Sequence, residues 1–204
     1  RAGDAPMAKK PLTSPTPRPG TVVEFLHGDQ PQLAWVLEEA SGKVRAVTST
    51  GRDIKLAQAR ILPWTGPTHP ADATPQEALD ALAEHHMRRA ELQGAVDAME
   101  IWELAQGEVD KAPVAWFAGL VHDEPDADQA AAVGRALLEL KTHFKFQPPD
   151  FLVHPAEKVE QRMAQQARQE ERERLTTASS ALVQALWANP TAGRAPGPPV
   201  DAPM

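Results

Sequence analysis

Four cationic residues early in the chain have the type and spacing that suit the binding of phosphate groups. They fall within and just before the segment VRAVTSTGRDIKL, as Lys43, Arg45, Arg52 and Lys55. Turn residues around Gly51 separate two runs rich in β-branched residues, so this segment predicts a β-hairpin that presents the cations. Basic side chains on such a surface can bind the phosphates of a nucleic acid. The alternative for any one of them is an ordinary solvated charge on an exposed β face.

The distribution of charge also favours the first part of the chain. The whole sequence has a net charge of −7, but residues 1–64 hold nine Lys or Arg and six Asp or Glu, a net of +3. The remaining residues hold 12 cationic and 22 acidic groups, a net of −10. A phosphate-binding surface has to be positive, so the first part is the better candidate. Trp35 lies in the same part, either as a stacking face for a base or as a core residue.

Motifs for metal, nucleotide or nucleophilic chemistry are missing from the sequence. There is no cysteine, and none of the seven histidines belongs to an HExxH or HxH motif. Phosphate loops of the GxxxxGK or GxGxxG type, a GxSxG elbow and an adjacent Asp-Asp pair are absent as well. His122 precedes an acidic cluster that fits a helix start better than a metal site. We therefore expect no catalytic residue, metal ligand or cofactor in this chain, and the lack of cysteine fits a reducing cytoplasm.

Proline-rich stretches divide the sequence into folded and unfolded parts. The 20 prolines concentrate in three stretches, which predict a disordered tail over 1–19, a linker over 65–74 and a Pro-rich linker or tail over 190–204. The sequence is 42% hydrophobic overall, which is enough to build a core in the segments between them. No apolar run approaches the roughly 20 residues that a membrane-spanning helix needs, so no membrane partner is expected.

Residues 20–64 predict a small antiparallel β module. Five short runs rich in Val, Ile and Leu are separated by the turn segments HGDQP, ASG, STGRD and AQA. This spacing is typical of a five-stranded barrel of the SH3-like kind, in which closure of the sheet hides its edges. The basic hairpin would form part of this barrel.

Residues 75–156 show helix-forming runs with apolar residues at helical spacing. The runs begin near Pro75, near Pro113 and at Asp126 or Asp128. They lead into HFKFQPPDFLVHP, whose two short apolar runs predict a β-hairpin. Helix, short helix, helix and hairpin is the order of a winged-helix (helix-turn-helix) domain, with the hairpin as its wing. The expected fold class is therefore α+β.

The register of the predicted wing follows from its turn. With residues 148–150 as a three-residue turn, Phe146 faces Leu152 and Phe144 faces His154. Alternation along the strands then places Phe144, Phe146 and Leu152 on the face that packs on the helices.

The helix near 128–142 would hold the recognition position of this domain. Arg135 and Lys141 on this helix, with Lys145 in the wing, are weaker candidates for RNA binding, because residues 111–162 hold six cationic and eight acidic groups. The same surface could dock on protein. After the wing, residues 157–189 predict one long C-terminal helix whose middle, QQARQEERER, is polar all round.

Two stretches of this sequence resemble parts of one enzyme family. GTVVEF and LAWVLEEASGKVRAVTSTGRDIKLAQARILP resemble the small N-terminal β module of some bacterial and organellar exoribonucleases with an RNB catalytic domain (ribonuclease II/R-like). RALLELKTHFKFQPPDFLVHPAEKVEQ and the Glu- and Arg-rich helix after it resemble the winged-helix region that replaces cold-shock domains in that subset. The resemblance runs from about Gly20 to Trp187.

The resemblance implies a role with single-stranded RNA. Members of this family degrade such RNA from the 3′ end, using magnesium held by a cluster of aspartates in the RNB domain. That cluster is absent from this sequence, so no catalytic residue carries over. The chain would be the N-terminal part of a longer hydrolase that captures RNA and guides it to the RNB catalytic domain of the same protein.

Two other functions fit the sequence. A stand-alone winged-helix transcription regulator would bind particular duplex DNA sequences, commonly as a dimer on paired half-sites. A protein-docking scaffold built on the long helix would bind no nucleic acid, and the acidic second part of the chain fits that function.

Overall fold

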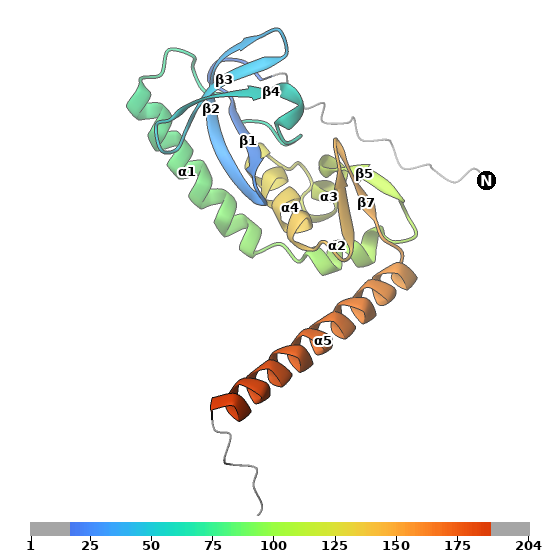
Figure 1. Ribbon diagram of the computed structural model, residues 1–204. Coiled ribbons are helices and arrows are strands. Elements are labelled where there is room, and N and C mark those ends of the chain that lie inside the picture. The colour runs from blue at the N-terminus through green and yellow to red at the C-terminus, as the bar shows by residue number, and fades with distance from the viewer. Residues whose placement is uncertain (1–16, 189–204) are drawn as a thin grey trace, which may run out of the picture. The chain divides into compact units, whose positions relative to one another are not determined.

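The computed structural model describes residues 17–188, which form an α+β fold (Figure 1). The tail expected over 1–19 falls outside the described residues up to residue 16, and the one over 190–204 falls outside them entirely. The chain divides into two compact units, Arg1–Val159 and Glu160–Met204. The β module and the helical segment after it therefore belong to one unit.

A four-stranded antiparallel sheet forms the first part of this unit, in the order β1-β2-β3-β4. Its strands are β1 Val22–His27, β2 Gln30–Ala40, β3 Lys43–Thr48 and β4 Asp53–Ala57. Gly28, Gly42 and Gly51 lie in the three hairpin turns with positive φ, a conformation in which a Cβ atom is unfavourable. The antiparallel sheet expected from the turn spacing is confirmed, but it has four strands rather than the five expected.

The chain returns to β1 after a short 3-10 helix, η1 (Gln58–Arg60). Isolated bridges join Phe25 to Ile61 and Thr21 to Thr68. The backbone N–H of Leu62 also donates to the carbonyl of Glu24 at 2.7 Å. Residues 61–69 thus run along the free edge of β1. The segment expected to be a linker begins with residues that are paired to the sheet.

The two faces of the sheet pack on different partners. One face encloses a core of its own, which holds Val23, Phe25, Ala34, Val36, Val44, Ala46 and Leu56. The other face packs Val22, Leu33 and Trp35 on Ala78 and Leu82 of α1 (Pro75–Gly94). Thr74 caps this helix by accepting from the backbone N–H of Glu77, whose carboxylate accepts from the Thr74 N–H in return. Trp35 is buried, so it is a core residue rather than a stacking face.

The rest of the first unit places helices around a three-stranded antiparallel sheet in the order β5-β7-β6. Its elements are α2 Ala98–Ala105, β5 Lys111–Pro113, α3 Val114–Val121, α4 Ala127–Glu139, β6 Phe144–Gln147 and β7 Asp150–Val153. Their core includes Phe117, Leu137 and Phe151. Trp64, from the segment after the first sheet, packs into this same core.

The predicted register of the wing is wrong by one residue. Phe144 pairs with Val153 and Phe146 with Phe151, because the turn uses two residues and Asp150 already belongs to β7. A shift of one residue exchanges the faces of a strand. Phe151 and Val153 are therefore buried, whereas Leu152 is half-buried.

The expected long C-terminal helix is α5, Ala156–Ala188. Its first turn belongs to the first unit, where Val159 is buried in the core. The remainder, from Glu160, belongs to the second unit. Among the helices of residues 17–188, none combines the length and the apolar character needed to cross a membrane.

Candidate nucleic-acid interface

The predicted basic hairpin brings its cations onto one outward face. Arg45 of β3 stands directly opposite Lys55 of β4, and Lys43 lies two residues before Arg45. Side chains two residues apart point to the same side of a strand. All three are exposed, while their neighbours Val44, Ala46 and Leu56 point into the core. We call Lys43, Arg45 and Lys55 the basic face.

Carboxylates interrupt the basic face. A guanidinium nitrogen of Arg45 lies 3.4 Å from Asp53 and another lies 3.9 Å from Glu38. All three side chains are about half exposed or more, so water screens both ion pairs. Surface pairs of this kind contribute about 0–1 kcal/mol, and a phosphate can displace such a carboxylate at little cost. Arg52 is also exposed, in the turn that precedes β4.

The candidates from the helical part are dispersed. Lys141 follows the end of α4 and is 71% exposed, with its ammonium nitrogen 3.1 Å from Asp29 in the β1–β2 turn. Lys145 is exposed on β6. Neither residue stands on the sheet that carries the basic face.

Arg135 does not belong to any exposed surface. Its side chain is only 6% exposed, and its Nε donates to Oε1 of Glu24 at 2.6 Å. The sequence marked one apolar face of α4, but in the structure α4 also packs on α1 and pairs with β1 through this contact (Figure 1). Because the guanidinium is enclosed, the prediction that Arg135 contacts RNA does not fit its position.

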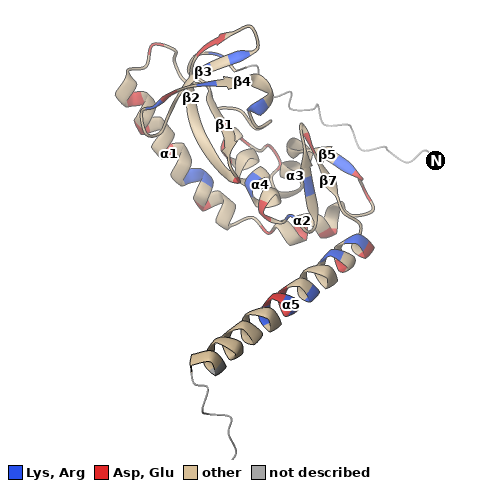
Figure 2. Ribbon diagram, in the orientation of Figure 1, with Lys and Arg blue, Asp and Glu red and all other residues tan. Residues whose placement is uncertain are grey.

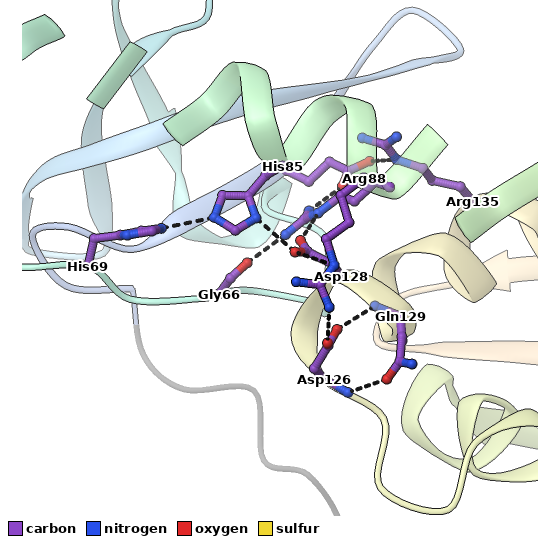
Figure 3. A network of polar contacts seen from close by, with 10 residues as sticks. Gly66, His69, His85, Arg88, Asp126, Asp128, Gln129 and Arg135 are labelled. Carbon is purple, nitrogen blue, oxygen red and sulfur yellow. Dashed lines mark hydrogen bonds and ion pairs between the residues drawn. The ribbon is translucent and has the colours of Figure 1, made fainter. Parts of the chain in front are cut away.

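A buried network of charges surrounds this contact (Figure 3). Arg89 of α1 is completely buried. Its Nη1 donates to Glu24 at 2.7 Å, its Nε to Asp128 at 2.7 Å and its Nη2 to the carbonyl of Gly66 at 2.6 Å. Two guanidinium groups thus balance two carboxylates, which together join β1, α1 and α4. We call Glu24, Arg89, Asp128 and Arg135 the buried charge network.

Two histidines extend the network toward the sheet. His85 Nδ1 lies 2.8 Å from Asp128, and its Nε2 lies 2.9 Å from Nε2 of His69. Such a contact between two ring nitrogens holds one proton, so both cannot carry a proton there at once. The ring of His69 also stacks on Trp35, with centroids 5.1 Å apart. The histidines therefore fasten the segment after the sheet to α1.

Burial and pairing set the ionisation of these groups. Burial and the neighbouring His85 lower the pKa of His69 below its ordinary value of 6.5. Burial alone would raise the pKa of Asp128, but hydrogen bonds from His85 and Arg89 outweigh it and hold this pKa below 3.8. An ionised Asp128 beside Arg89 is a structural ion pair. The network thus orients helices rather than exposing a reactive group.

Sequence reasoning missed this network, although the sequence contains a signal for it. Glu24 interrupts the apolar run VVEFL, on the same strand face as Val22 and Leu26. On α1, Leu82, His85 and Arg89 follow one another at helical spacing, and all three are buried. A buried charge needs an opposite charge beside it, so an acidic residue in a buried strand and an arginine in line with a buried leucine are expected to pair.

The described part of the chain holds no group of three or more His, Cys, Asp or Glu side chains that could bind a metal ion. Asp126 of the acidic cluster after His122 instead caps α4, accepting from the backbone N–H of Gln129 at 2.8 Å. Comparison with protein-family models, with curated proteins and with solved structures gives no match for this chain.

Proposed function

We propose that this chain is the RNA-binding and guiding module of an RNB-family exoribonuclease, whose catalytic domain lies outside these residues. The enzyme would degrade single-stranded RNA from the 3′ end in the cytoplasm, with magnesium in the RNB domain. The chain's own part is to bind RNA and pass it to that domain.

The order of elements supports this proposal. Four antiparallel strands, β1-β2-β3-β4, and a segment that returns along β1 are compatible with an SH3-like barrel. The elements α2, β5, α3, α4, β6 and β7, with the sheet order β5-β7-β6, follow the order of a winged-helix domain. A barrel, a winged helix and a long helix, in that sequence, are the modules on which the resemblance to the RNB family rests.

The observation that carries the proposal is the contrast between the basic face and α4. A winged-helix protein that reads duplex DNA needs the recognition helix, here α4, exposed along one side. Eight of its residues, from Asp128 to Leu137, are buried. The cations of the basic face are exposed on neighbouring strands instead. A positive surface with no reading helix favours sequence-tolerant binding to a phosphate backbone.

Fluorescence anisotropy of the 204-residue chain with single-stranded RNA, single-stranded DNA and duplex DNA, at two salt concentrations, tests the proposal. We expect salt-sensitive RNA binding that weakens in the Lys43→Gln/Lys55→Gln variant, with the salt slope reduced by about 0.7 for each phosphate that the variant no longer binds. The matched control is Lys111→Gln/Arg174→Gln, which removes the same charge from exposed cationic residues outside the basic face.

Two outcomes would contradict the proposal. Binding confined to particular duplex sequences would favour a transcription regulator, and binding to none of the three nucleic acids would favour a protein-docking scaffold. Equal affinities for Lys43→Gln/Lys55→Gln and its control variant would exclude the basic face from RNA binding.

A further inference from the structure

The second unit has a helix face with a different composition from the rest of its surface. Along α5, eight residues follow one another at intervals of three or four, which places them on one side of the helix. They are Arg162, Gln165, Gln169, Arg172, Thr176, Ser179, Val183 and Trp187. We call them the α5 stripe. Arg172, Thr176, Ser179 and Val183 all line one shallow surface recess, which agrees with this spacing.

Charge is separated around this helix rather than accumulated on it. Residues 160–188 hold four Arg and four Glu, so their net charge is zero. At about 100° per residue, Arg168 lies beside the α5 stripe, whereas Glu160, Glu170 and Glu171 point to other sides. Glu173 stands at the border, where it accepts from Nε2 of Gln169 at 2.7 Å. Three of the four Arg therefore lie on or beside the α5 stripe, and three of the four Glu lie away from it.

The α5 stripe changes character along its length. Its charged residues lie before Leu175, and residues 175–188 carry no charge (Figure 2). Val183 is 52% exposed, and Trp187, which ends the stripe, is 83% exposed. An indole left in water is a flat surface on which a base can stack. One half of the face thus offers cations and amides, and the other half hydroxyl groups and an aromatic ring.

This chemistry suits a single-stranded nucleic acid better than a protein. A protein interface has an apolar centre depleted of charge. The α5 stripe could form the seam of a coiled coil only if Gln165, Gln169 and Arg172 were apolar. Single-strand binding instead combines cations along the backbone with aromatic rings for the bases. The stretch from Arg162 to Trp187 spans about 38 Å of helix, enough for several nucleotides.

We propose that single-stranded RNA binds along the α5 stripe, with Arg162, Arg168 and Arg172 at its phosphates and Trp187 stacked on a base. This inference rests on the proposed function and assigns to it a second RNA-binding surface. The amides of Gln165 and Gln169 suit the sugar hydroxyls and base edges between those two ends.

Two neighbouring arginines provide the test. Arg172 belongs to the α5 stripe, and Arg174 points about 200° away from it on the same helix. Arg172→Gln and Arg174→Gln remove the same charge and keep a helix-forming residue. In anisotropy titrations of the full chain with labelled oligouridine, we expect Arg172→Gln to lower the salt slope by about 0.7 and weaken binding, and Arg174→Gln to leave both unchanged.

A second pair tests the aromatic end. Trp187→Ala should weaken oligouridine binding by about tenfold, the loss typical of one stacked base. Leu182→Ala removes a comparably exposed apolar side chain, 64% exposed, that lies outside the stripe, and it should leave binding unchanged. Circular dichroism of each variant should show the same helix content, because both side chains lie in water.

The outcomes separate this inference from the proposed function. Wild-type chain that binds no RNA overturns both. RNA binding that depends on Lys43 and Lys55, but is equal for Arg172→Gln and Arg174→Gln, overturns the α5 stripe and leaves the proposed function standing. Sedimentation that shows a dimer abolished by Leu182→Ala, with RNA binding unaffected by Trp187→Ala, would make this helix a protein contact and overturn the inference.

Discussion

Arginine has opposite roles in the buried charge network and in the basic face. Arg89 is completely buried between Glu24 and Asp128, whereas Arg45 is 48% exposed between Glu38 and Asp53. In the network each guanidinium nitrogen of Arg89 has a fixed acceptor, and in the basic face the partners are exposed and loosely placed. Burial rather than residue type decides which arginine holds the fold and which can bind a ligand.

The energetics of the two regions differ for the same reason. Charges removed from water cannot recover the lost hydration, so taking away one partner leaves the other uncompensated. An exposed charge that loses its partner is hydrated again at once. A variant in the network should therefore change stability, and a variant in the basic face should change binding alone.

Variants of the adjacent residues Arg88 and Arg89 test this comparison with the largest expected effect. Arg89→Met leaves two buried carboxylates without their shared cation, and we expect the free energy of unfolding to fall by about 3–5 kcal/mol. Arg88→Met removes an arginine that is 51% exposed and whose Nε lies 3.7 Å from Asp128; Arg89 still pairs with this carboxylate, so the cost should stay below about 1 kcal/mol. Urea unfolding of both variants measures the difference. Equal losses would mean that the network contributes no more than a surface pair.

Local signals in the sequence were sufficient for most of the elements, although the three residues of β5 were not expected. Pro75 begins α1 and Pro113 precedes α3, as expected. Each of these signals acts within a few residues of the chain. The two-residue turn at Pro148 and Pro149 was the exception, because it is compatible with two registers and only packing on the helices selects one.

Local signals could not predict the contact between α4 and β1. Sequence alone places Arg135 on an exposed surface, because Val133 and Leu137 already give α4 one apolar face. Its actual partner, Glu24, lies 111 residues away in sequence. Long-range pairs leave no periodic pattern, so an arginine that is buried in an ion pair looks like a solvated one. The basic face, in contrast, depends on one hairpin. Three of the four cations that the sequence grouped share one face of this hairpin, and Arg52 lies in its turn.

Alanine substitutions at two glycines compare a tightly packed helix position with an open one. A Cβ atom at Gly134 of α4 would lie 2.5 Å from the ring of Trp64, so Gly134→Ala should lower the free energy of unfolding by about 1–3 kcal/mol. A Cβ atom at Gly119 of α3 meets nothing within 4 Å. Gly119→Ala should therefore stabilise the protein, by about 1 kcal/mol or less, since alanine favours a helix. Thermal unfolding of both variants gives the signs, and a Gly134→Ala variant as stable as the wild type would contradict the packing of α4 on Trp64.

The smallest effect on stability is expected from a change of pH. The histidines and the carboxylates respond to different pH ranges. Burial lowers the pKa of His69 and of His143 below 6.5, so the unfolded chain takes up these protons before the folded one does. Stability is therefore complete above about pH 6.5 and falls as the pH decreases below it. Asp128 has a lowered pKa, so its contribution is lost only below 3.8.

Urea unfolding at about pH 7.5 and about pH 5.5 measures the effect of the histidines, because both pH values lie above the range in which Asp128 becomes protonated. We expect the wild-type chain to lose stability between these two values. His69→Gln should lose less, because it removes a group whose pKa is lowered by burial and by the neighbouring His85. His86→Gln, on the exposed side of α1, is the matched control and should retain the wild-type loss. If His69→Gln and His86→Gln had the same pH dependence, the contact between His69 and His85 would contribute nothing to the stability that is lost over this pH range.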